Sequence, residues 1–159
     1  MGVGKSSVAR HVAHIIGTRM VDLDHVIEKN EHRPISQIVD HEGEEAFRSI
    51  ETKNLERILK DKNVRVLSLG GGAWTIPANR DLLKASDYTT VWLEATFEHC
   101  WLNITFSKKD RPLARDKEKA IKLFEARQKV YCLADWHFVI RSGLTSYEVA
   151  QQIVEEIYS

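Results

Sequence analysis

Cysteine is scarce in this sequence of 159 residues, which holds only Cys100 and Cys132. Their spacing matches neither a C-x-x-C motif nor a set of metal ligands, and two thiols do not make the disulfide framework of a small secreted domain. Unpaired thiols suit a reducing compartment, so we expect a cytoplasmic protein.

The sequence also lacks a long apolar run and an excess of either charge. No stretch approaches the length needed to span a membrane, and the first residues lack the basic and then apolar character of a secretory signal. Lysine plus arginine and aspartate plus glutamate are equal at 23 each, so no net field attracts nucleic acid. We therefore expect neither a membrane nor a nucleic-acid partner, and any anion must bind through local groups.

Helical and strand patterns alternate along the chain. Short apolar strands are predicted at 19–24, 64–69, 88–95 and 136–140, and segments with helical spacing lie before, between and after them. At this length one hydrophobic core is expected. The order predicts a single α/β domain over residues 1–159, a three-layer sandwich in which helices flank a parallel sheet.

The first ten residues, MGVGKSSVAR, contain the end of a phosphate-binding loop. In such a loop, backbone N–H groups surround phosphate oxygens at the start of a helix, a lysine reaches the outer phosphates and a hydroxyl holds magnesium. The last part of the motif G-x-x-x-x-G-K-[ST] is matched by Gly2, Gly4, Lys5 and Ser6. Taken alone, this fragment fits an ordinary turn as well as it fits a nucleotide site.

Acidic residues and glycines follow two of the predicted strands. Asp22 and Asp24 end the first strand, where their carboxylates would point the same way and serve a metal ion and a substrate hydroxyl. A plain turn is the simpler explanation when they are taken alone. Three glycines, Gly70, Gly71 and Gly72, follow the second strand and indicate the close approach of a ligand or of another backbone segment.

Three arginines lie in contexts unlike an ordinary solvated surface. Arg48 lies between Phe47 and Ile50 on a core-facing helix, where its guanidinium can reach inward to a carboxylate. Arg111 opens the segment RPLA within a charged loop, and an arginine that closes over phosphates stabilises phosphoryl transfer. Arg127 lies late on the next helix. Each arginine by itself is more often a surface residue than a site residue.

Histidine and tryptophan give weaker signals. His11 and His14 are one helical turn apart, but no third ligand lies near them in the sequence, so we expect exposed helix residues rather than a metal site. The four tryptophans follow no stacking pattern and are expected in the core or in pocket walls.

In combination these segments resemble the shikimate kinase family over nearly the whole chain. The succession MGVGKSS, DLDHVIE, GEEAFRSIE, LGGGA, NRDLL, VWLE, RPLA, EARQKVY and AD follows the motifs of that family at their usual spacings. The resemblance implies a P-loop kinase fold of the nucleoside-monophosphate-kinase type. It also implies transfer of the γ-phosphate of ATP to the 3-hydroxyl of shikimate, a step of aromatic amino-acid (chorismate) biosynthesis.

On the nucleotide side, the resemblance implies ATP and Mg²⁺ as cofactors. The loop that would hold the ATP phosphates consists of Gly2, Val3, Gly4, Lys5, Ser6 and Ser7. Ser6 and Asp22 would bind Mg²⁺, and Lys5 would act on the transferred phosphate. Arg111 would close over the phosphates from a lid loop at about 105–119, which accounts for the charged composition there.

On the acceptor side, the resemblance implies a substrate-binding helical region at about 25–60. Asp24 would hydrogen-bond the shikimate hydroxyls and act as the base. Arg48 and Arg127 would clamp the shikimate carboxylate, and Glu51 would orient Arg48. Backbone groups that face the ring would come from Gly70, Gly71 and Gly72. Two arginines suit a small carboxylate, and phosphoryl transfer needs mainly positioning and charge neutralisation.

The amino end is the main departure from the family pattern, because the segment that supplies an interior first strand would lie before Met1. We expect the chain as printed to lack that strand and to be less stable and less active than an extended form. We also expect a monomer. The alternatives to an active shikimate kinase are a non-catalytic or truncated relative and a related small-molecule kinase such as gluconate kinase.

Overall fold

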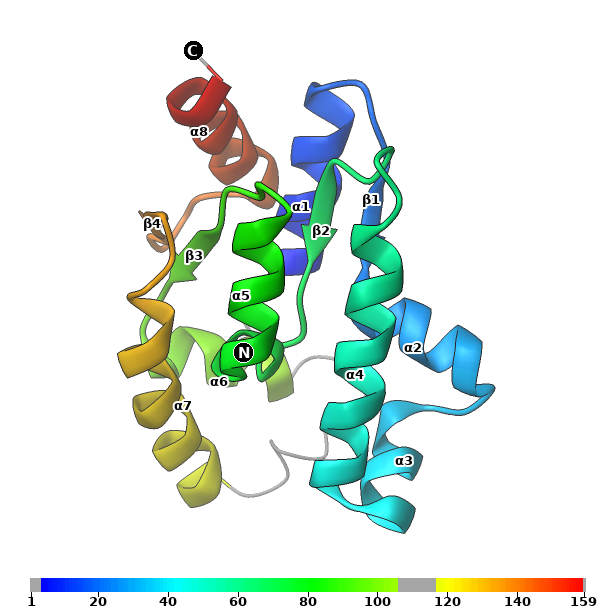
Figure 1. The fold of residues 1–159 in the computed structure, drawn as a ribbon. Helices are drawn as coiled ribbons and strands as arrows, with labels where there is room; N and C mark the ends of the chain where they lie inside the picture. The colour runs from blue at the N-terminus through cyan, green and yellow to red at the C-terminus, as the bar shows by residue number, and fades with distance from the viewer. Residues whose placement is uncertain (1–3, 106–116, 159) are drawn as a thin grey trace.

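The computed structural model describes residues 4–105 and 117–158, so Gly2, Val3, Arg111 and most of the expected lid loop lie outside the described residues. In chain order the elements are α1 (Lys5–Ile15), β1 (Met20–Asp22), α2 (Leu23–Glu31), α3 (Ile35–Glu42), α4 (Glu44–Leu59), β2 (Val66–Ser68), the 3₁₀ turn η1 (Ala73–Thr75), α5 (Pro77–Ala85), β3 (Val91–Glu94), α6 (Phe97–Thr105), α7 (Lys117–Tyr131), β4 (Trp136–Val139) and α8 (Ser146–Tyr158). Short parallel strands lie between layers of helices, and the predicted fold class is confirmed (Figure 1).

The described strands form two separate parallel pairs. Met20 of β1 lies opposite Val66 of β2, and Val91 of β3 lies opposite Trp136 of β4. Within the described residues no strand pairing joins β2 to β3, so the sheet consists of two halves. The arrows of β2 and β3 point toward the same end of the molecule in Figure 1. The carboxyl ends of both pairs therefore meet at one edge.

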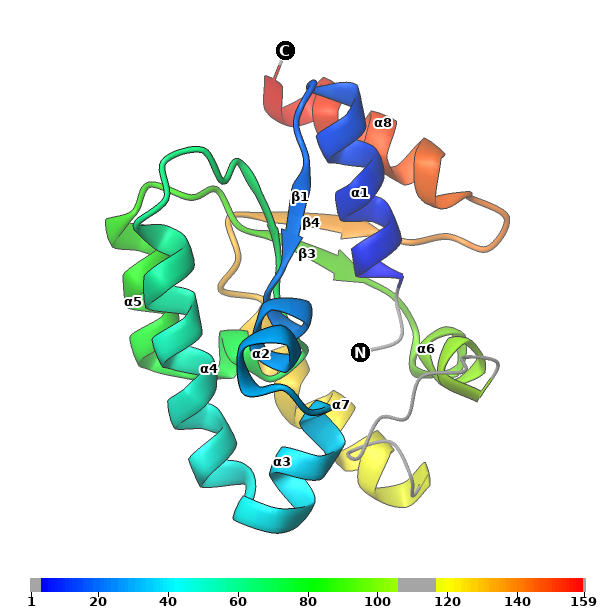
Figure 2. The same cartoon turned by 90° about the vertical axis from the view of Figure 1, so that its right-hand side faces the viewer.

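Two apolar clusters lie on opposite faces of the strands. Leu67 of β2 packs with the cluster around Leu55, which α2, α4 and α5 enclose. The preceding residue, Val66, packs with the cluster around Ile153, which α1 and α8 enclose. Successive strand residues point to opposite faces, so β2 serves both clusters. Figure 2 shows α1 and α8 on one side of the strands and α4 and α5 on the other.

Most predicted elements are confirmed, with bounds that differ by a few residues. The amide of Thr145 donates to Glu148 Oε2 at 2.7 Å and the amide of Glu148 donates to Thr145 Oγ1 at 3.1 Å, which is a reciprocal cap at the start of α8. Sequence analysis missed η1 and α5. No helix of the described segments is long and apolar enough to cross a membrane.

Candidate active site

The triple glycine, residues 70–72, forms a turn between β2 and η1 on which side chains from three helices converge. We call it the glycine turn. An added Cβ atom would lie 2.6 Å from Asp24 Oδ1 at Gly70, 2.7 Å from Arg127 Nη1 at Gly71 and 2.6 Å from Arg48 Cζ at Gly72. Such separations are shorter than a carbon atom tolerates. Any larger residue would therefore have to displace one carboxylate or one of two guanidinium groups from the position that it holds at this edge.

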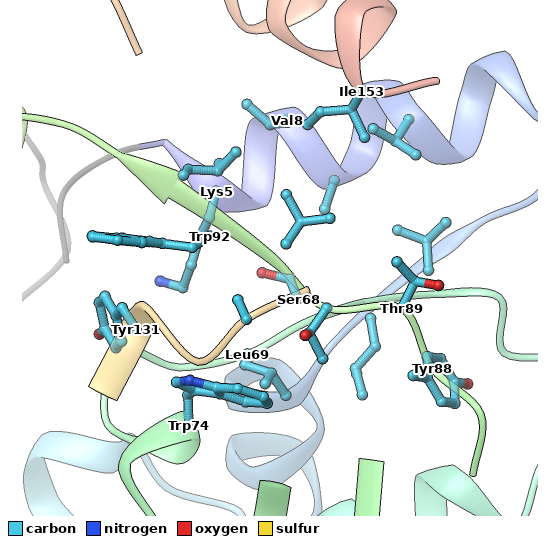
Figure 3. Close-up of a pocket in the computed structure, with 18 of the residues that line it drawn as sticks. Lys5, Val8, Ser68, Leu69, Trp74, Tyr88, Thr89, Trp92, Tyr131 and Ile153 are labelled. Carbon is cyan, nitrogen blue, oxygen red and sulfur yellow. The ribbon is translucent and has the colours of Figure 1, made fainter. Parts of the chain in front are cut away.

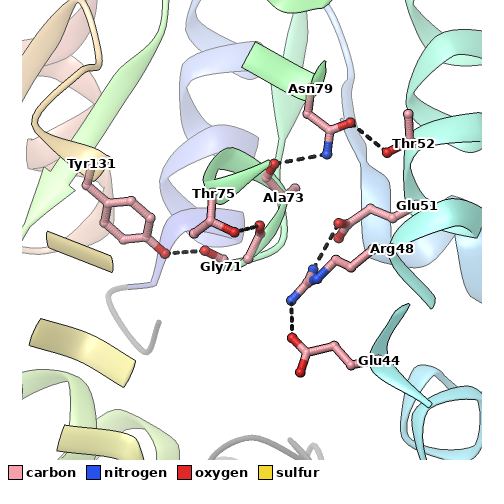
Figure 4. A network of polar contacts seen from close by, with 10 residues as sticks. Glu44, Arg48, Glu51, Thr52, Gly71, Ala73, Thr75, Asn79 and Tyr131 are labelled. Atoms are coloured by element: carbon pink, nitrogen blue, oxygen red, sulfur yellow. Dashed lines mark hydrogen bonds and ion pairs between the residues drawn. The ribbon is translucent and has the colours of Figure 1, made fainter. Parts of the chain in front are cut away.

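The carbonyl groups of the turn and of η1 accept hydrogen bonds from side chains of α5, of α7 and of η1 itself (Figure 4). Gly71 O accepts from Tyr131 Oη, Gly72 O from Thr75 Oγ1 at 2.5 Å, Ala73 O from Asn79 Nδ2 at 2.9 Å, and Trp74 O from Arg80 Nη1 at 2.7 Å. None of the described residues accepts a hydrogen bond from the amides of Gly71 and Gly72. Hydrogen bonds to its carbonyl groups thus fix the turn, and the amides of Gly71 and Gly72 can donate to a ligand.

Arg48 is held by two acidic side chains of its own helix. Its Nη1 donates to Glu51 Oε1 at 2.9 Å and its Nη2 to Glu44 Oε1 at 3.2 Å. Glu51 is only 1% exposed, and burial raises the pKa of its carboxyl, although the adjacent Arg48 opposes this shift. The Phe47 ring lies 5.1 Å from the guanidinium carbon. The expected contact between Arg48 and Glu51 is present, and it fixes the direction of the guanidinium.

Arg127 differs from Arg48 because no salt bridge joins it to the part of the chain that the structure describes. It is 6% exposed. Burial lowers the pKa of Arg127, Tyr131 opposes this shift, and the nearby cation Arg48 adds to it. Burial also raises the pKa of Tyr131. A buried guanidinium without an acidic partner, close to a second guanidinium, favours a bound anion such as a carboxylate.

The phosphate-loop residues that the structure describes lie at the start of α1. Gly4 precedes the helix in the left-handed conformation, with φ of 80°, which glycine adopts without strain. Lys5, Ser6 and Ser7 form the first turn, where the backbone amides of a helix start and the helix dipole favour an anion. Lys5 lines the same cavity as Gly71, so the helix start and the glycine turn share one space.

The sequence analysis expected Asp22 and Asp24 to point the same way from an extended strand. The structure shows a different arrangement. Asp22 ends β1 and caps α2, since its Oδ1 accepts from the amides of Asp24 at 3.0 Å and His25 at 3.4 Å. Asp24 therefore lies in the first turn of α2. The cap turns the chain, which aims the Asp22 carboxylate at α1 and the Asp24 carboxylate at Gly70.

Ser6 and Asp22 are the described residues that suit a magnesium ion. Ser6 Oγ donates to Asp22 Oδ2 at 3.0 Å, so a hydroxyl and a carboxylate oxygen already lie together at the start of α1. Oxygen donors of this kind, few in number and completed by water and phosphate, are what Mg²⁺ prefers. No cluster of three or more acidic, histidine or cysteine side chains with metal-binding geometry occurs in the described segments. The pair fits an ion held mainly by a nucleotide.

Several supporting residues escaped the sequence analysis. Tyr131 and Asn79 lie within quoted motifs, but nothing in the sequence linked them to the glycine turn, and Glu44 was not paired with Arg48. The tryptophan expectation is confirmed for Trp74 and Trp92, which line the cavity, and is wrong for Trp136, which is 38% exposed on β4. The expectation for the first histidine was wrong: His11 is half-buried, with its ring 5.5 Å from that of Tyr147.

Comparisons with known proteins agree with this geometry. The family model described as shikimate kinase matches residues 1–158. A shikimate kinase of Persephonella marina is 37% identical over 162 aligned residues, which cover 99% of this chain and 94% of the relative. A solved structure of shikimate kinase from Acinetobacter baumannii in complex with shikimate has a TM-score of 0.91 at 33% identity and covers 99% of this chain and 88% of that one. A shikimate kinase structure from Bacteroides thetaiotaomicron has a TM-score of 0.88 at 25% identity and covers 100% and 94% of the two chains.

Proposed function

The chain belongs to the shikimate kinase family and phosphorylates shikimate with ATP, and we propose that the side chains around the glycine turn bind and activate the acceptor. The observation that carries this proposal is the convergence of Asp24, Arg48 and Arg127 on three glycines. One carboxylate beside two guanidiniums matches an acceptor that has hydroxyl groups at one end and a carboxylate at the other.

Arg48 and Arg127 bind the shikimate carboxylate in this proposal. Arg48 is already directed by Glu44 and Glu51, and Arg127 is buried without an acidic partner among the described residues. The substrate carboxylate supplies that partner, so binding relieves an unbalanced positive charge. The free amides of Gly71 and Gly72 add hydrogen bonds that fix the orientation of the ring.

Asp24 is the proposed base. The 3-hydroxyl oxygen of shikimate attacks the γ-phosphorus of ATP, the bond from that phosphorus to the β–γ bridging oxygen breaks, and the hydroxyl proton passes to the Asp24 carboxylate. ADP and shikimate 3-phosphate result. Positioning and charge neutralisation dominate such a transfer, and the Lys5 ammonium together with the first amides of α1 serves the phosphate side.

Ser6 and Asp22 are the proposed residues that hold Mg²⁺, because their oxygens already lie 3.0 Å apart beside the phosphate-binding turn. When bound with ATP, the ion neutralises phosphate charge. Gly2, Val3 and Arg111 keep the roles that the family resemblance implies, but they lie outside the described residues. We also propose that the protein is cytoplasmic and monomeric; sedimentation of the purified chain tests the monomer.

A coupled ATP assay with shikimate tests the assigned roles. Lys5→Ala and Asp24→Asn should abolish turnover, while the lysine variant still binds shikimate in calorimetry. Arg48→Ala and Arg127→Ala should mainly raise KM for shikimate. Arg57→Ala, on the exposed side of α4, is the matched control and should change neither constant. Undiminished turnover of either of the first two variants would reject their roles.

The alternatives are separated by the same assay. A gluconate kinase has no reason to place two arginines at an acceptor carboxylate beside this carboxylate and glycine turn, and turnover of gluconate but not shikimate would favour it. A non-catalytic relative would bind shikimate without any turnover of ATP. The retention of Lys5, Asp24 and both arginines in one place favours the active enzyme.

A further inference from the structure

Asn79 is a polar side chain of α5 with 0% of its surface exposed. Its amide has two partners, both drawn in Figure 4: Nδ2 donates to Ala73 O at 2.9 Å, and Oδ1 accepts from Thr52 Oγ1 at 2.8 Å. Because Ala73 O can only accept, the amide nitrogen must face it, and the Thr52 hydroxyl must donate to the other end. The three residues form a buried connection from α4 through α5 to η1, which we call the Asn79 bridge.

Both ends of the Asn79 bridge lie next to groups of the acceptor site. Thr52 is one helical turn after Arg48 on α4, so the two side chains leave the same side of the helix. Ala73 directly follows Gly72, and its amide donates to Gly70 O at 3.1 Å. The bridge therefore connects the helix that carries Arg48 to the turn that Arg48 faces.

The hydrogen bonds of Arg48 itself have a different effect. They go to Glu51 and Glu44, which lie on the same helix. They fix the guanidinium relative to α4, but they do not fix α4 relative to the glycine turn. A Cβ atom at Gly72 would lie only 2.6 Å from Arg48 Cζ, so a small shift of the helix changes the space between guanidinium and turn by a large fraction.

We propose that Asn79 is a positioning residue for the acceptor: through Thr52 and Ala73 it sets the separation between the Arg48 guanidinium and the Gly72 amide. The proposal rests on the proposed function, in which these two groups bind shikimate. A leucine has about the same size and would fill the same place without the cost of burying an amide. A buried amide with a partner at each end instead gives directional contacts, which hold two elements at a defined distance.

The nucleotide side of the site does not depend on the bridge. Figure 3 shows Lys5, from α1, and Trp74, from η1, on opposite walls of the cavity. Neither Thr52 nor Asn79 belongs to the lining of that cavity. Loss of the bridge should therefore affect the binding of shikimate and leave the binding of ATP unchanged.

Thr52→Val tests the proposal, because valine keeps the shape of threonine and removes the donor. KM for shikimate, and the Kd for shikimate measured by calorimetry without nucleotide, should rise about three- to tenfold, which is the effect of weakening about one hydrogen bond. KM for ATP should stay near that of the parent. Thr52→Ser keeps the hydroxyl and should give nearly the parent KM for shikimate.

Two further variants separate positioning from stability. Thr52→Val leaves Asn79 Oδ1 buried without a partner, so it should also lower the unfolding temperature. The double variant Thr52→Val/Asn79→Leu replaces both polar groups by apolar ones and should regain stability, since Ala73 O still accepts from Ile76 N at 3.3 Å. Its KM for shikimate should nevertheless stay raised. Leu83→Ala, 3% exposed and one turn further along α5, is the matched control: it should lower the unfolding temperature and leave KM for shikimate unchanged.

Arg48→Ala separates failure of this proposal from failure of the proposed function. A raised KM for shikimate in Arg48→Ala, together with a parent value in Thr52→Val, would reject the role of the bridge alone. A parent value in Arg48→Ala would reject the proposed function and the bridge with it. Added to Arg48→Ala, Thr52→Val should have a smaller effect than in the parent, because a group that the bridge positions is already absent.

Two other results would overturn the proposal. One is an equal effect of Thr52→Val in both backgrounds. The other is a KM for shikimate that follows the unfolding temperature through the whole series, including Leu83→Ala, because this would limit the Asn79 bridge to a structural role. If the double variant does not fold, the comparison of Thr52→Val, Thr52→Ser and Leu83→Ala decides.

Discussion

At the scale of single residues, the glycine turn shows how an absent atom creates a site. Each of its three glycines faces the functional group of one charged side chain, and the groups come from α2, α4 and α7. A methyl group at any of the three positions would occupy the place of a carboxylate or a guanidinium. Replacement of glycine by alanine should therefore impair a different step of the reaction at each of the three positions.

Gly70→Ala should lower kcat, because the added Cβ displaces the Asp24 carboxylate, whereas Gly72→Ala should raise KM for shikimate, because it displaces Arg48. We expect kcat to fall by about tenfold or more in the first variant and KM to rise by about tenfold or more in the second, since misplacement by about 1 Å is costly in catalysis. Steady-state kinetics with shikimate measures both. Gly143→Ala, which introduces strain at a φ of 90° with no atom within 4 Å of the added carbon, is the control for general destabilisation. Identical kinetic changes in Gly70→Ala and Gly72→Ala would contradict the assignment.

Glu51 gives a pH-dependent prediction. Its pKa is raised in the folded protein by burial, so the folded chain holds this proton more tightly than the unfolded chain does. The stability that this group contributes is fully present below the ordinary glutamate pKa of about 4.3 and is lost as pH rises through the raised value. Glu51→Gln stays neutral and escapes this loss.

The free energy of unfolding of the parent minus that of Glu51→Gln should therefore fall as pH increases from about 4. Urea titrations of both proteins over a pH series measure this difference. Glu56→Gln, exposed on the same helix, should give a difference that changes little with pH. A parent that gains stability over the variant with rising pH would show that Arg48 outweighs burial at this carboxyl.

At the scale of elements, two consecutive residues of α7 form hydrogen bonds, one with the glycine turn and one with η1. Tyr131 Oη donates to Gly71 O, and Val130 O accepts from Trp74 Nε1 at 2.9 Å. Arg127 lies one turn earlier on the same helix. These two hydrogen bonds therefore set the distance between Arg127 and the glycine turn that it faces.

Tyr131→Phe should destabilise the protein by about 1 kcal/mol, because Gly71 O loses its donor in a partly buried place. It should also raise KM for shikimate with little change in KM for ATP, since Arg127 and the turn move apart. Chemical unfolding and steady-state kinetics provide the two measurements. Tyr147→Phe, whose side chain is exposed on α8, should leave stability and both KM values near those of the parent. A fall in stability without any change in KM for shikimate would limit Tyr131 to a structural role.

Elements with strong periodicity were predicted well, and the others were not. α1 and α8 follow apolar spacing with clear ends, whereas α5 was missed because its sequence, PANRDLLKA, has few apolar residues after Pro77. The family resemblance singled out Asp24, Arg48 and the three glycines, which the structure brings together. The hydrogen bond from Tyr131 to Gly71 could not be predicted from the sequence, because a contact between residues 60 apart leaves no local pattern.

At the scale of the whole molecule, the two strand pairs differ in how well apolar side chains cover them. β1 and β2 lie beside the cluster that α2, α4 and α5 enclose. β4 is an outer strand with an open face, where Trp136 is 38% exposed and Val139 is 58% exposed. Local opening is easiest where few apolar contacts cover the backbone.

Amide hydrogen exchange should therefore be faster in β4 than in β1 and β2, although Trp136 N donates to Thr90 O at 3.0 Å and Ile140 N to Glu94 O at 2.7 Å. Exchange followed by NMR or mass spectrometry measures this order. Slower exchange in β4 than in β2 would show that the second half of the sheet is the more stable one.

The glycine turn also limits which mutations the site can accept during evolution. Every codon change that replaces one of its glycines adds a Cβ atom, and that atom collides with a side chain that the site itself uses. An inhibitor that takes its contacts from the backbone of Gly71 and Gly72 would therefore meet a surface on which resistance mutations disable the enzyme. Escape would have to arise at more distant positions, where side chains can vary without displacing Asp24, Arg48 or Arg127.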